Sequence, residues 1–370
     1  MTKLSKIKLK PGLHRESTQY EEEGKWYDGN HVRFRSGKPE NMRGYETKVS
    51  TAFDGSARDL ITYQSGNNKK RAVFGTPDKL YAHNGDTITD ITPIVTAVTL
   101  ANVFGTSSGS TRVCCSDTSH NQKVGNYVYF TSTATFNAVS LSTNVYPIVS
   151  VDSTNVFTIS VTDAANATAS DVGSATFNYL LPTGNSIATG GLGYGAAAFQ
   201  ATVCASQTRA WSEAASADAS DIVFDITQWS LDNWGDDVVA NRNGGNIYYF
   251  DSDASTVPIR ATSITTSPIS VNSIVVSPND RHLIALGANS YAAATTVSGP
   301  FDPMLVRWSD QDDRTNWVPS LTTTSGEVVL TDGTKIIGGL RSRSAIHIWT
   351  DNAMWTMQYV GPPFTFRFTP

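Results

Sequence analysis

Two groups of aspartates are the residues whose types and spacing could do chemistry in this chain. They are Asp310, Asp312 and Asp313, and Asp232, Asp236 and Asp237. Clustered carboxylates can hold a calcium ion or flank a glycosidic bond as acid and base. Arg314 and Asn316 break the calcium-loop pattern, which requires a third oxygen ligand, then a glycine and a distal glutamate. Aspartates in turns usually accept hydrogen bonds from their own backbone, so we expect turn formation and keep metal binding or catalysis as the alternative.

The other residues that could react lack the neighbours that a reaction requires. The six histidines show no H-x-x-x-H or H-E-x-x-H spacing, and no G-x-S-x-G nucleophile elbow is present. The Gly-rich stretch 190–195 is followed by no lysine, so we interpret it as a mobile connection and not as a phosphate-binding loop. We therefore predict no enzyme, no cofactor, no metal and no small-molecule substrate.

The cysteines and the apolar residues limit where the protein is made. The chain has three cysteines, vicinal Cys114 and Cys115 and distant Cys204, which fit neither a disulfide framework nor a four-ligand zinc site. We expect at least one thiol of the vicinal pair to be buried and synthesis to take place in a reducing compartment. The sequence lacks a run of about 18 apolar residues, and no apolar stretch follows the N-terminal lysines. We expect neither a transmembrane helix nor a signal peptide.

The elements that must position these side chains are predicted to be strands. Charged residues make up only 16% of the chain, aromatic residues 10%, and Ser and Thr are abundant. This composition favours a half-buried pleated surface. Residues 32–35 alternate before the turn Ser36-Gly37, and Asn84-Gly85 is typical of a hairpin turn.

The organisation of the chain indicates a β-propeller with an inserted domain. Residues 1–92 are interpreted as an N-terminal arm and the first blades, and 93–182 as an inserted small β domain rich in Thr, Ser and Val. Residues 183–370 would be the Gly-rich connection and the remaining blades. Trp308-Ser309-Asp310 recurs as Trp349-Thr350-Asp351 after about 41 residues, close to the blade period.

Charge is divided unevenly between the arm and the rest of the chain. The first 50 residues hold 11 basic and 7 acidic side chains, which leaves 17 basic and 26 acidic side chains in the other 320. Nucleic-acid binding requires clustered Lys and Arg, and only the arm could supply such a cluster. The candidate partner-interface residues in the arm are Lys6, Lys8, Lys10, Arg33 and Arg35. The alternative is that these charges protect a strand edge from unwanted pairing.

Several stretches of the sequence resemble the tail-nozzle proteins of short-tailed bacteriophages, also called tail hub or packaged-DNA stabilisation proteins. The N-terminal stretch contains Pro11-Gly12, Glu22 to Trp26, Asp28, Val32 to Glu40 and Gly44. The central stretches are Gly190 to Gly195, Trp234 to Asn241 and Gly244 to Tyr248. The late stretches are Arg307 to Asp310, Trp317 to Pro319, Leu330, Gly333, Ile336 to Gly338, Trp349 to Asp351 and Met357 to Phe366. These matches occur in order and span most of the chain outside 93–182.

The resemblance implies an all-β, propeller-based subunit without catalytic residues. Six copies would form a ring below the head–tail adaptor protein, near tail fibres or spikes. Double-stranded DNA would be retained and then conducted through the lumen without sequence-specific binding. Such a protein is made in the host cytoplasm and resides in the virion tail. Relatives continue well past the Val360-Gly361-Pro362 stretch, so we expect the chain to be either a short variant of the propeller or one that is incomplete at Pro370.

Two alternatives remain open from the residues alone. A glycan-binding or glycan-cleaving propeller, a lectin or glycosidase, would use aromatic stacking and an aspartate pair. Residues 309–317 resemble the Asp-box turn of sialidase propellers, although the glycine of that turn is missing. A host-recognition fibre or spike is the third reading, but the long fibrous repeats that it usually needs are absent.

Overall fold

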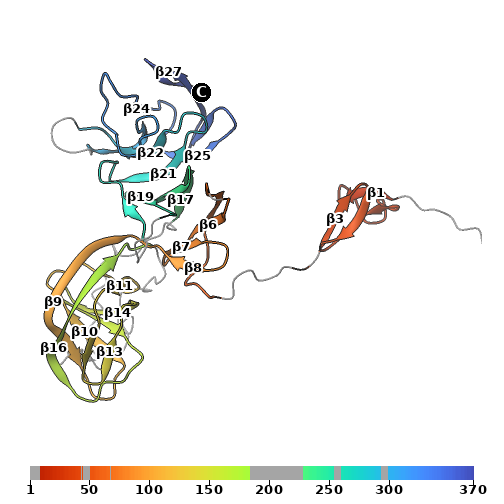
Figure 1. Cartoon of the computed structure of the whole chain (residues 1–370). Helices are drawn as coiled ribbons and strands as arrows, with labels where there is room; N and C mark the ends of the chain where they lie inside the picture. The colour runs from red at the N-terminus through yellow and green to blue at the C-terminus, as the bar shows by residue number, and fades with distance from the viewer. Residues whose placement is uncertain are drawn as a thin grey trace, which may run out of the picture. The chain divides into compact units, whose positions relative to one another are not determined.

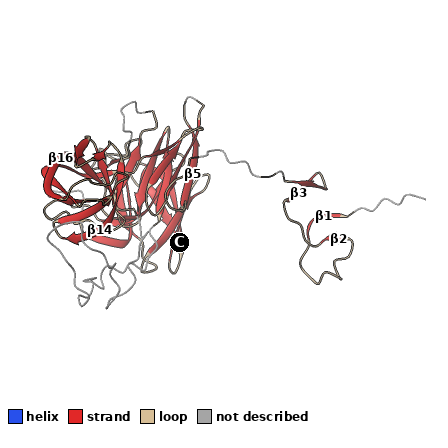
Figure 2. Cartoon of the chain, turned by 90° about the horizontal axis from the view of Figure 1, so that it is seen from below, coloured by secondary structure: helices blue, strands red, loops and turns tan. Residues whose placement is uncertain are grey.

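The computed structural model of the chain describes residues 9–42, 44, 51–66, 68–183, 228–253, 260–292 and 299–370. It forms two compact units, Met1–Ser50 and Thr51–Pro370, which we call the N-terminal unit and the main unit. The predicted all-β class is confirmed, since the described residues contain strands and no helix (Figure 2). None of the described residues forms a helix that could span a membrane.

The N-terminal unit consists of two short strand pairs. Its strands are β1 (Lys10–Leu13), β2 (Lys25–Trp26), β3 (Val32–Arg35) and β4 (Lys38–Asn41). β1 and β2 pair in parallel, whereas β3 and β4 form the hairpin that the alternation of residues 32–35 predicts. Ser36 and Gly37 both have positive φ, as the tight turn between these strands requires. The rings of Trp26 and Phe34 meet edge to face at 6.2 Å.

The main unit contains four antiparallel sheets of four strands, and in each sheet the strands pair in chain order. The first sheet contains β5 (Asp59–Gln64), β6 (Lys70–Gly75), β7 (Leu80–His83) and β8 (Ile88–Asp90). The second contains β17 (Trp229–Trp234), β18 (Asp237–Arg242), β19 (Ile247–Phe250) and β20 (Thr262–Ser263). The third contains β21 (Val271–Val276), β22 (Leu283–Asn289), β23 (Phe301–Trp308) and β24 (Gly326–Val329). The fourth contains β25 (Ile336–Arg341), β26 (Ile346–Thr350), β27 (Met354–Gly361) and β28 (Thr365–Thr369).

These four sheets form a stack in chain order (Figure 1). Their first strands contact one another in sequence, β5 with β17, β17 with β21, and β21 with β25. Each pair of successive sheets shares a hydrophobic core. Representative members are Val73 and Val238 between the first two sheets, Val239 and Leu283 between the next two, and Leu286 and Ile348 between the last two. Tryptophans enter these cores, since Trp229, Trp234, Trp308, Trp317 and Trp355 are buried.

Between the first and second sheets the chain forms a closed six-stranded barrel, with strand order β10-β15-β14-β11-β16-β9. Its strands are β9 (Ile94–Thr106), β10 (Arg112–Ser116), β11 (Tyr127–Phe130), β14 (Val145–Ser153), β15 (Val156–Ser160) and β16 (Ala169–Leu180). A separate hairpin pairs β12 (Ala134–Phe136) with β13 (Val139–Leu141). These strands lie within the stretch that the sequence predicts to be an inserted β domain.

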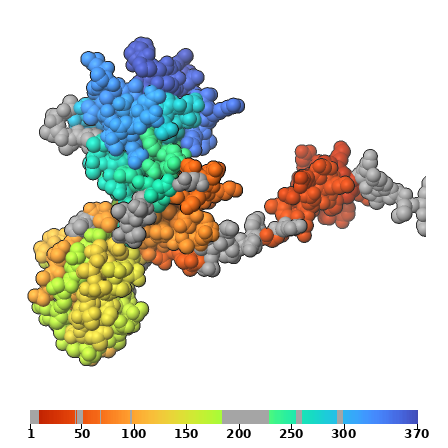
Figure 3. Space-filling model, in the orientation of Figure 1, coloured from red at the N-terminus to blue at the C-terminus, as the bar shows by residue number. Residues whose placement is uncertain are grey.

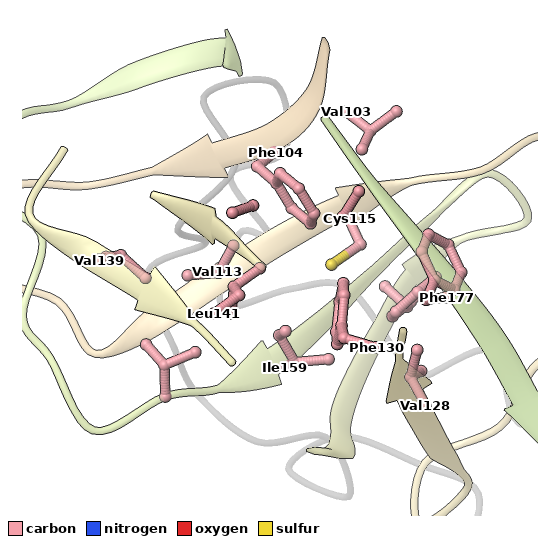
Figure 4. Packing of buried hydrophobic residues seen from close by; sticks show 14 of the residues in the cluster. Val103, Phe104, Val113, Cys115, Val128, Phe130, Val139, Leu141, Ile159 and Phe177 are labelled. Carbon is pink, nitrogen blue, oxygen red and sulfur yellow. The ribbon is translucent and has the colours of Figure 1, made fainter. Parts of the chain in front are cut away.

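The barrel encloses a core of aromatic and β-branched side chains (Figure 4). Phe104, Phe130 and Phe177 are fully buried in it. Both vicinal cysteines are buried as well, and burial raises the pKa of the Cys115 thiol, which is free. Cys114, in contrast, is disulfide-bonded, which the cysteine spacing did not predict.

Cations of the stack lie over tyrosines of the barrel where these two parts of the main unit meet. The Lys79 ammonium lies 4.6 Å from the Tyr127 ring centre, and the Arg260 guanidinium 4.7 Å from that of Tyr129. Arg260 also forms a salt bridge with Asp90 at 3.2 Å. In the space-filling view the barrel is a separate lobe in yellow and green, and the last three sheets run from green to blue (Figure 3).

The proposed 41-residue repeat does not correspond to a repeat of the structure. Trp308 ends β23, the third strand of its sheet, whereas Trp349 lies near the end of β26, the second strand of its sheet. The two Trp-(Ser/Thr)-Asp sequences therefore occupy different positions in their sheets. The hairpin prediction at Asn84-Gly85 is confirmed, because Asn84 Oδ1 accepts the Thr87 N–H at 3.0 Å between β7 and β8.

Candidate functional site

The aspartates at 310–313 form turns with their own loop, as the sequence predicts. Asp310 Oδ1 accepts hydrogen bonds from Thr324 Oγ1 at 2.6 Å, Thr324 N–H at 2.8 Å and Gln311 N–H at 3.0 Å. Burial alone would raise the pKa of Asp310, but these hydrogen bonds outweigh it, and the pKa lies below its usual value. Asp313 Oδ1 accepts from Thr315 N–H and Oγ1, and Asp312 pairs with Arg281 at 3.2 Å. Asp310 and Asp313 therefore hold the loop together, and Asp312 joins it to Arg281 in the turn before β22.

A buried histidine lies behind this loop, and it was not singled out from the sequence. His282 is inaccessible to solvent; its Nδ1 contacts Asp280 Oδ2, and its Nε2 lies 3.0 Å from Thr324 Oγ1. This is the order of an acid, a base and a hydroxyl nucleophile. The Thr324 hydroxyl hydrogen, however, is directed to Asp310, and the His282 ring packs against Tyr359 and Phe366. The arrangement supports the 310–324 loop and exposes no nucleophile.

The second aspartate group joins neighbouring sheets. Asp232 Oδ2 accepts the buried Val276 N–H of the third sheet at 2.7 Å, and its Oδ1 lies 3.1 Å from Arg341 of the fourth. Burial raises the pKa of Asp232, and the hydrogen bond from Val276 and the charge of Arg341 offset that only in part. Asp59 makes the corresponding bond one sheet earlier, because its Oδ2 accepts the Leu231 N–H at 3.0 Å.

Asp236 and Asp237 complete this second group. Asp236 Oδ1 accepts the Gly66 N–H of the first sheet's loop at 2.7 Å, and Asp237 forms a salt bridge with Arg314 at 3.2 Å. Burial raises the pKa of Asp237, with Arg314 opposing the shift. Within the described ranges no group of three or more His, Cys, Asp or Glu side chains could hold a metal ion. The aspartates of this group serve as acceptors and ion-pair partners that connect sheets.

The predicted partner-interface residues lie in the N-terminal unit where they are described. Lys10 is exposed and stands opposite Lys25 in the β1–β2 pair, and Arg35 is exposed at the end of β3. Arg33 is engaged with Glu40 across the hairpin at 3.1 Å. Lys6 and Lys8 lie outside the described residues, as does the Gly-rich stretch 190–195.

Apolar side chains accompany these cations on the same small unit. Tyr20 is 92% exposed, and Leu13 and Met42 are nearly half exposed. Tyr, Met and Arg are enriched at protein interfaces, so this unit carries residue types from which such a surface is built. The basic residues allowed this region to be predicted as an interface from the sequence. The exposure of Leu13 and Tyr20 could not be predicted, because nothing in their spacing indicates it.

Comparisons with known proteins add little to this description. No protein-family model matches the chain, and no curated protein matches it. Among solved structures, that of the phage phi92 endosialidase matches at 16% sequence identity over 81% of this chain and 41% of its own, with a TM-score of 0.22. The chain thus spans about two fifths of that protein, and a likeness this low indicates neither fold nor activity.

Proposed function

We propose that this chain is a structural protein of the bacteriophage virion, the tail nozzle of a short-tailed phage. In this proposal its four sheets are blades of a β-propeller, and six copies form a ring below the head–tail adaptor. The ring retains packaged DNA and conducts it into the host during ejection. The observation that carries the proposal is the N-terminal unit, which exposes Leu13, Tyr20 and Met42 beside Lys10 and Arg35.

This observation supports assembly because a small unit gains little stability from its own core. Burial of apolar surface is the main favourable contribution to both folding and association. A unit that leaves a tyrosine almost fully exposed gains by placing it against a partner. The adjacent cations fit an acidic partner surface, which the proposal assigns to the adaptor.

The charge of the remaining chain supports a conduit. Residues 51–370 hold 17 basic and 26 acidic side chains, a net of 9 negative charges. A strongly basic wall would bind phosphates through release of counterions and slow the passage of DNA. An acidic or neutral wall lets the duplex pass.

The packing of the sheets supports the blade assignment. Propeller blades are four-stranded antiparallel sheets whose faces pack against one another around an axis. Here four such sheets share three successive cores, and their first strands contact one another in order.

Binding of the full-length chain to its purified head–tail adaptor tests this function. The charge-reversal variant Lys10→Glu/Arg35→Glu should weaken adaptor binding by about tenfold or more, because two attractive pairs become repulsive. The matched control Lys69→Glu/Arg343→Glu reverses two exposed cations of the main unit and should bind normally. Equal binding by both variants, or hydrolysis of chromogenic glycosides that Asp310→Asn abolishes, would refute the proposal in favour of another function.

A further inference from the structure

Four polar side chains behind the 310–324 loop form a row of contacts that begins and ends at a carboxylate. The row runs from Asp280 through His282 and Thr324 to Asp310. His282 Nδ1 contacts Asp280 Oδ2, and His282 Nε2 lies 3.0 Å from Thr324 Oγ1. That hydroxyl oxygen lies 2.6 Å from Asp310 Oδ1. Asp280 and His282 are buried, so the hydrogen atoms of these contacts must come from the side chains themselves.

The three contacts of this row need three hydrogen atoms, one between each pair of atoms. Two acceptor atoms at such distances repel each other when no hydrogen lies between them. With both carboxylates ionised only two hydrogens are present, one on the neutral His282 ring and one on the Thr324 hydroxyl. The Ser277 hydroxyl does not supply the third, because it donates to the other oxygen of Asp280. The row is complete only when it holds one additional proton.

The position of this proton follows from the state of Asp310. Burial alone would raise the pKa of Asp310, but hydrogen bonds from Thr324 and Gln311 and the charge of His282 lower it below its usual value. Asp310 is therefore ionised, and the Thr324 hydroxyl donates to it. His282 Nε2 must then donate to Thr324 Oγ1. The remaining hydrogen lies between His282 Nδ1 and Asp280, so the additional proton belongs to that pair.

We propose that Asp280 and His282 share one additional proton, and that this proton makes the attachment of the 310–324 loop sensitive to pH. When the proton is lost, the single hydrogen of the Thr324 hydroxyl has two acceptors to satisfy, Asp310 and His282. One of the two contacts then breaks, because a hydroxyl has only one hydrogen to donate. The inference is independent of the proposed virion function.

Thr324 is the residue through which this change reaches other parts of the main unit. Its carbonyl oxygen accepts hydrogen bonds from Trp308 Nε1 in β23 at 2.8 Å and from Thr365 Oγ1 in β28 at 3.2 Å. A change at the Thr324 side chain therefore acts where the loop meets the third and fourth sheets. We expect the loop to be held less firmly against both sheets after the proton is lost.

The other ionisable groups near His282 are engaged elsewhere. Among the described residues, the titratable or charged groups that face His282 or adjoin it are Asp280, Asp310, Tyr359, Arg281 and Asp312. Arg281 and Asp312 pair with each other at 3.2 Å, and both are exposed. The Tyr359 ring packs on His282, and its hydroxyl donates to Gln311 Oε1 at 3.4 Å. None of these three groups supplies the missing hydrogen.

His120 in the barrel provides an internal contrast. It is also buried, but its Nδ1 accepts the Gln122 N–H at 3.0 Å and its Nε2 lies 3.0 Å from the carbonyl oxygen of Ser153. A neutral ring with its hydrogen on Nε2 satisfies both contacts. The same count of hydrogens that requires an additional proton at His282 therefore requires none at His120.

Urea unfolding measured across a range of pH tests the proposal. The folded chain should keep the additional proton above about pH 6.5, where a histidine of the unfolded chain loses its own. The unfolding equilibrium constant should therefore increase above that pH, by up to about tenfold per pH unit. Asp280→Asn can supply the third hydrogen from its amide and still accept from Ser277, so this part of the pH dependence should disappear. Asp280→Ala can do neither and should unfold at lower urea at every pH.

Nuclear magnetic resonance of the full-length chain with 15N-labelled histidine locates the hydrogens directly. The variants His282→Gln and His120→Gln assign the two signals. Nε2 should carry a hydrogen in both rings, and only His282 should show a further hydrogen shared between its Nδ1 and a carboxylate. A His282 Nε2 without hydrogen would overturn the inference, as would identical pH profiles of the wild type and Asp280→Asn above neutrality. Neither result would affect adaptor binding, on which the proposed function depends.

Discussion

The barrel and the stack of sheets bury the faces of their strands differently, the barrel around one enclosed core and the stack between successive sheets. The barrel closes on itself, so none of its six strands is left as an edge, and one aromatic core fills it. The four described sheets of the stack are instead held by three separate cores and by inter-sheet aspartates such as Asp59 and Asp232. The stability of the barrel therefore depends on one core, whereas that of the stack is divided among several contacts between sheets.

The largest expected effect comes from removing a phenylalanine from the barrel. Phe177→Ala should cost the barrel about 3–5 kcal/mol of unfolding free energy, because it leaves a cavity in a fully buried core. Calorimetry should show a lower unfolding temperature for the barrel and an unchanged unfolding temperature for the stack. The control Phe301→Ala truncates a 42% exposed ring and should change stability by less than about 0.5 kcal/mol. An equal loss in both transitions would show that the two parts do not unfold independently.

Asp232 allows a smaller and more specific perturbation of the stack. Asp232→Ala removes the acceptor of the buried Val276 N–H and the partner of Arg341, and should cost about 1–3 kcal/mol. Asp232→Asn keeps an acceptor for Val276 N–H and should recover most of that loss in urea unfolding. If the two variants are equally destabilised, the ion pair with Arg341 and not the inter-sheet hydrogen bond is the dominant interaction.

The same aspartate predicts a pH dependence that belongs to the stack. Burial raises the pKa of Asp232 in the folded state above the ordinary value, so the folded protein holds this proton more tightly than the unfolded chain does. Unfolding free energy should therefore fall as pH rises from the unfolded pKa through the raised folded value. The decline should be shallower in Asp232→Asn, measured as the difference from wild type at each pH. An identical profile in both proteins would contradict the raised pKa.

The smallest expected effect on stability is in the N-terminal unit. Arg35→Ala should change the unfolding free energy by less than about 0.5 kcal/mol, since the side chain is exposed. Its adaptor binding should nevertheless decrease. Arg33→Ala provides the contrast, because Arg33 already pairs with Glu40 and should contribute less to binding. Thermal melting and adaptor affinity measured on the same samples separate the two quantities.

Local patterns predicted local structure well. The alternation at residues 32–35 and the turns at Ser36-Gly37 and Asn84-Gly85 specify hairpins because their signals lie within a few residues. The turn role of Asp310 could also be predicted, since some of its donors are adjacent. In contrast, the bond between His282 and Thr324 joins residues 42 positions apart, and nothing in their spacing reveals it.

Packing between sheets was the part that the sequence could not show. In the sequence Asp232 belongs to a cluster of carboxylates, but in the structure it accepts a hydrogen bond from the backbone N–H of Val276 in another sheet. The repeat predicted from Trp308 and Trp349 was wrong for a similar reason. The same residue types occur near the ends of a third strand and of a second strand, and the sequence does not reveal which strand of a sheet each belongs to. The exposure of Leu340 likewise depends on which face of its sheet is packed.

A cryo-electron microscopy reconstruction of the full-length chain assembled on its head–tail adaptor tests the central claim most directly. We predict a closed ring of copies in which Tyr20 and Leu13 of each N-terminal unit are buried against the adaptor. Separate copies on the adaptor, or a ring in which Tyr20 stays open to solvent, would contradict this account.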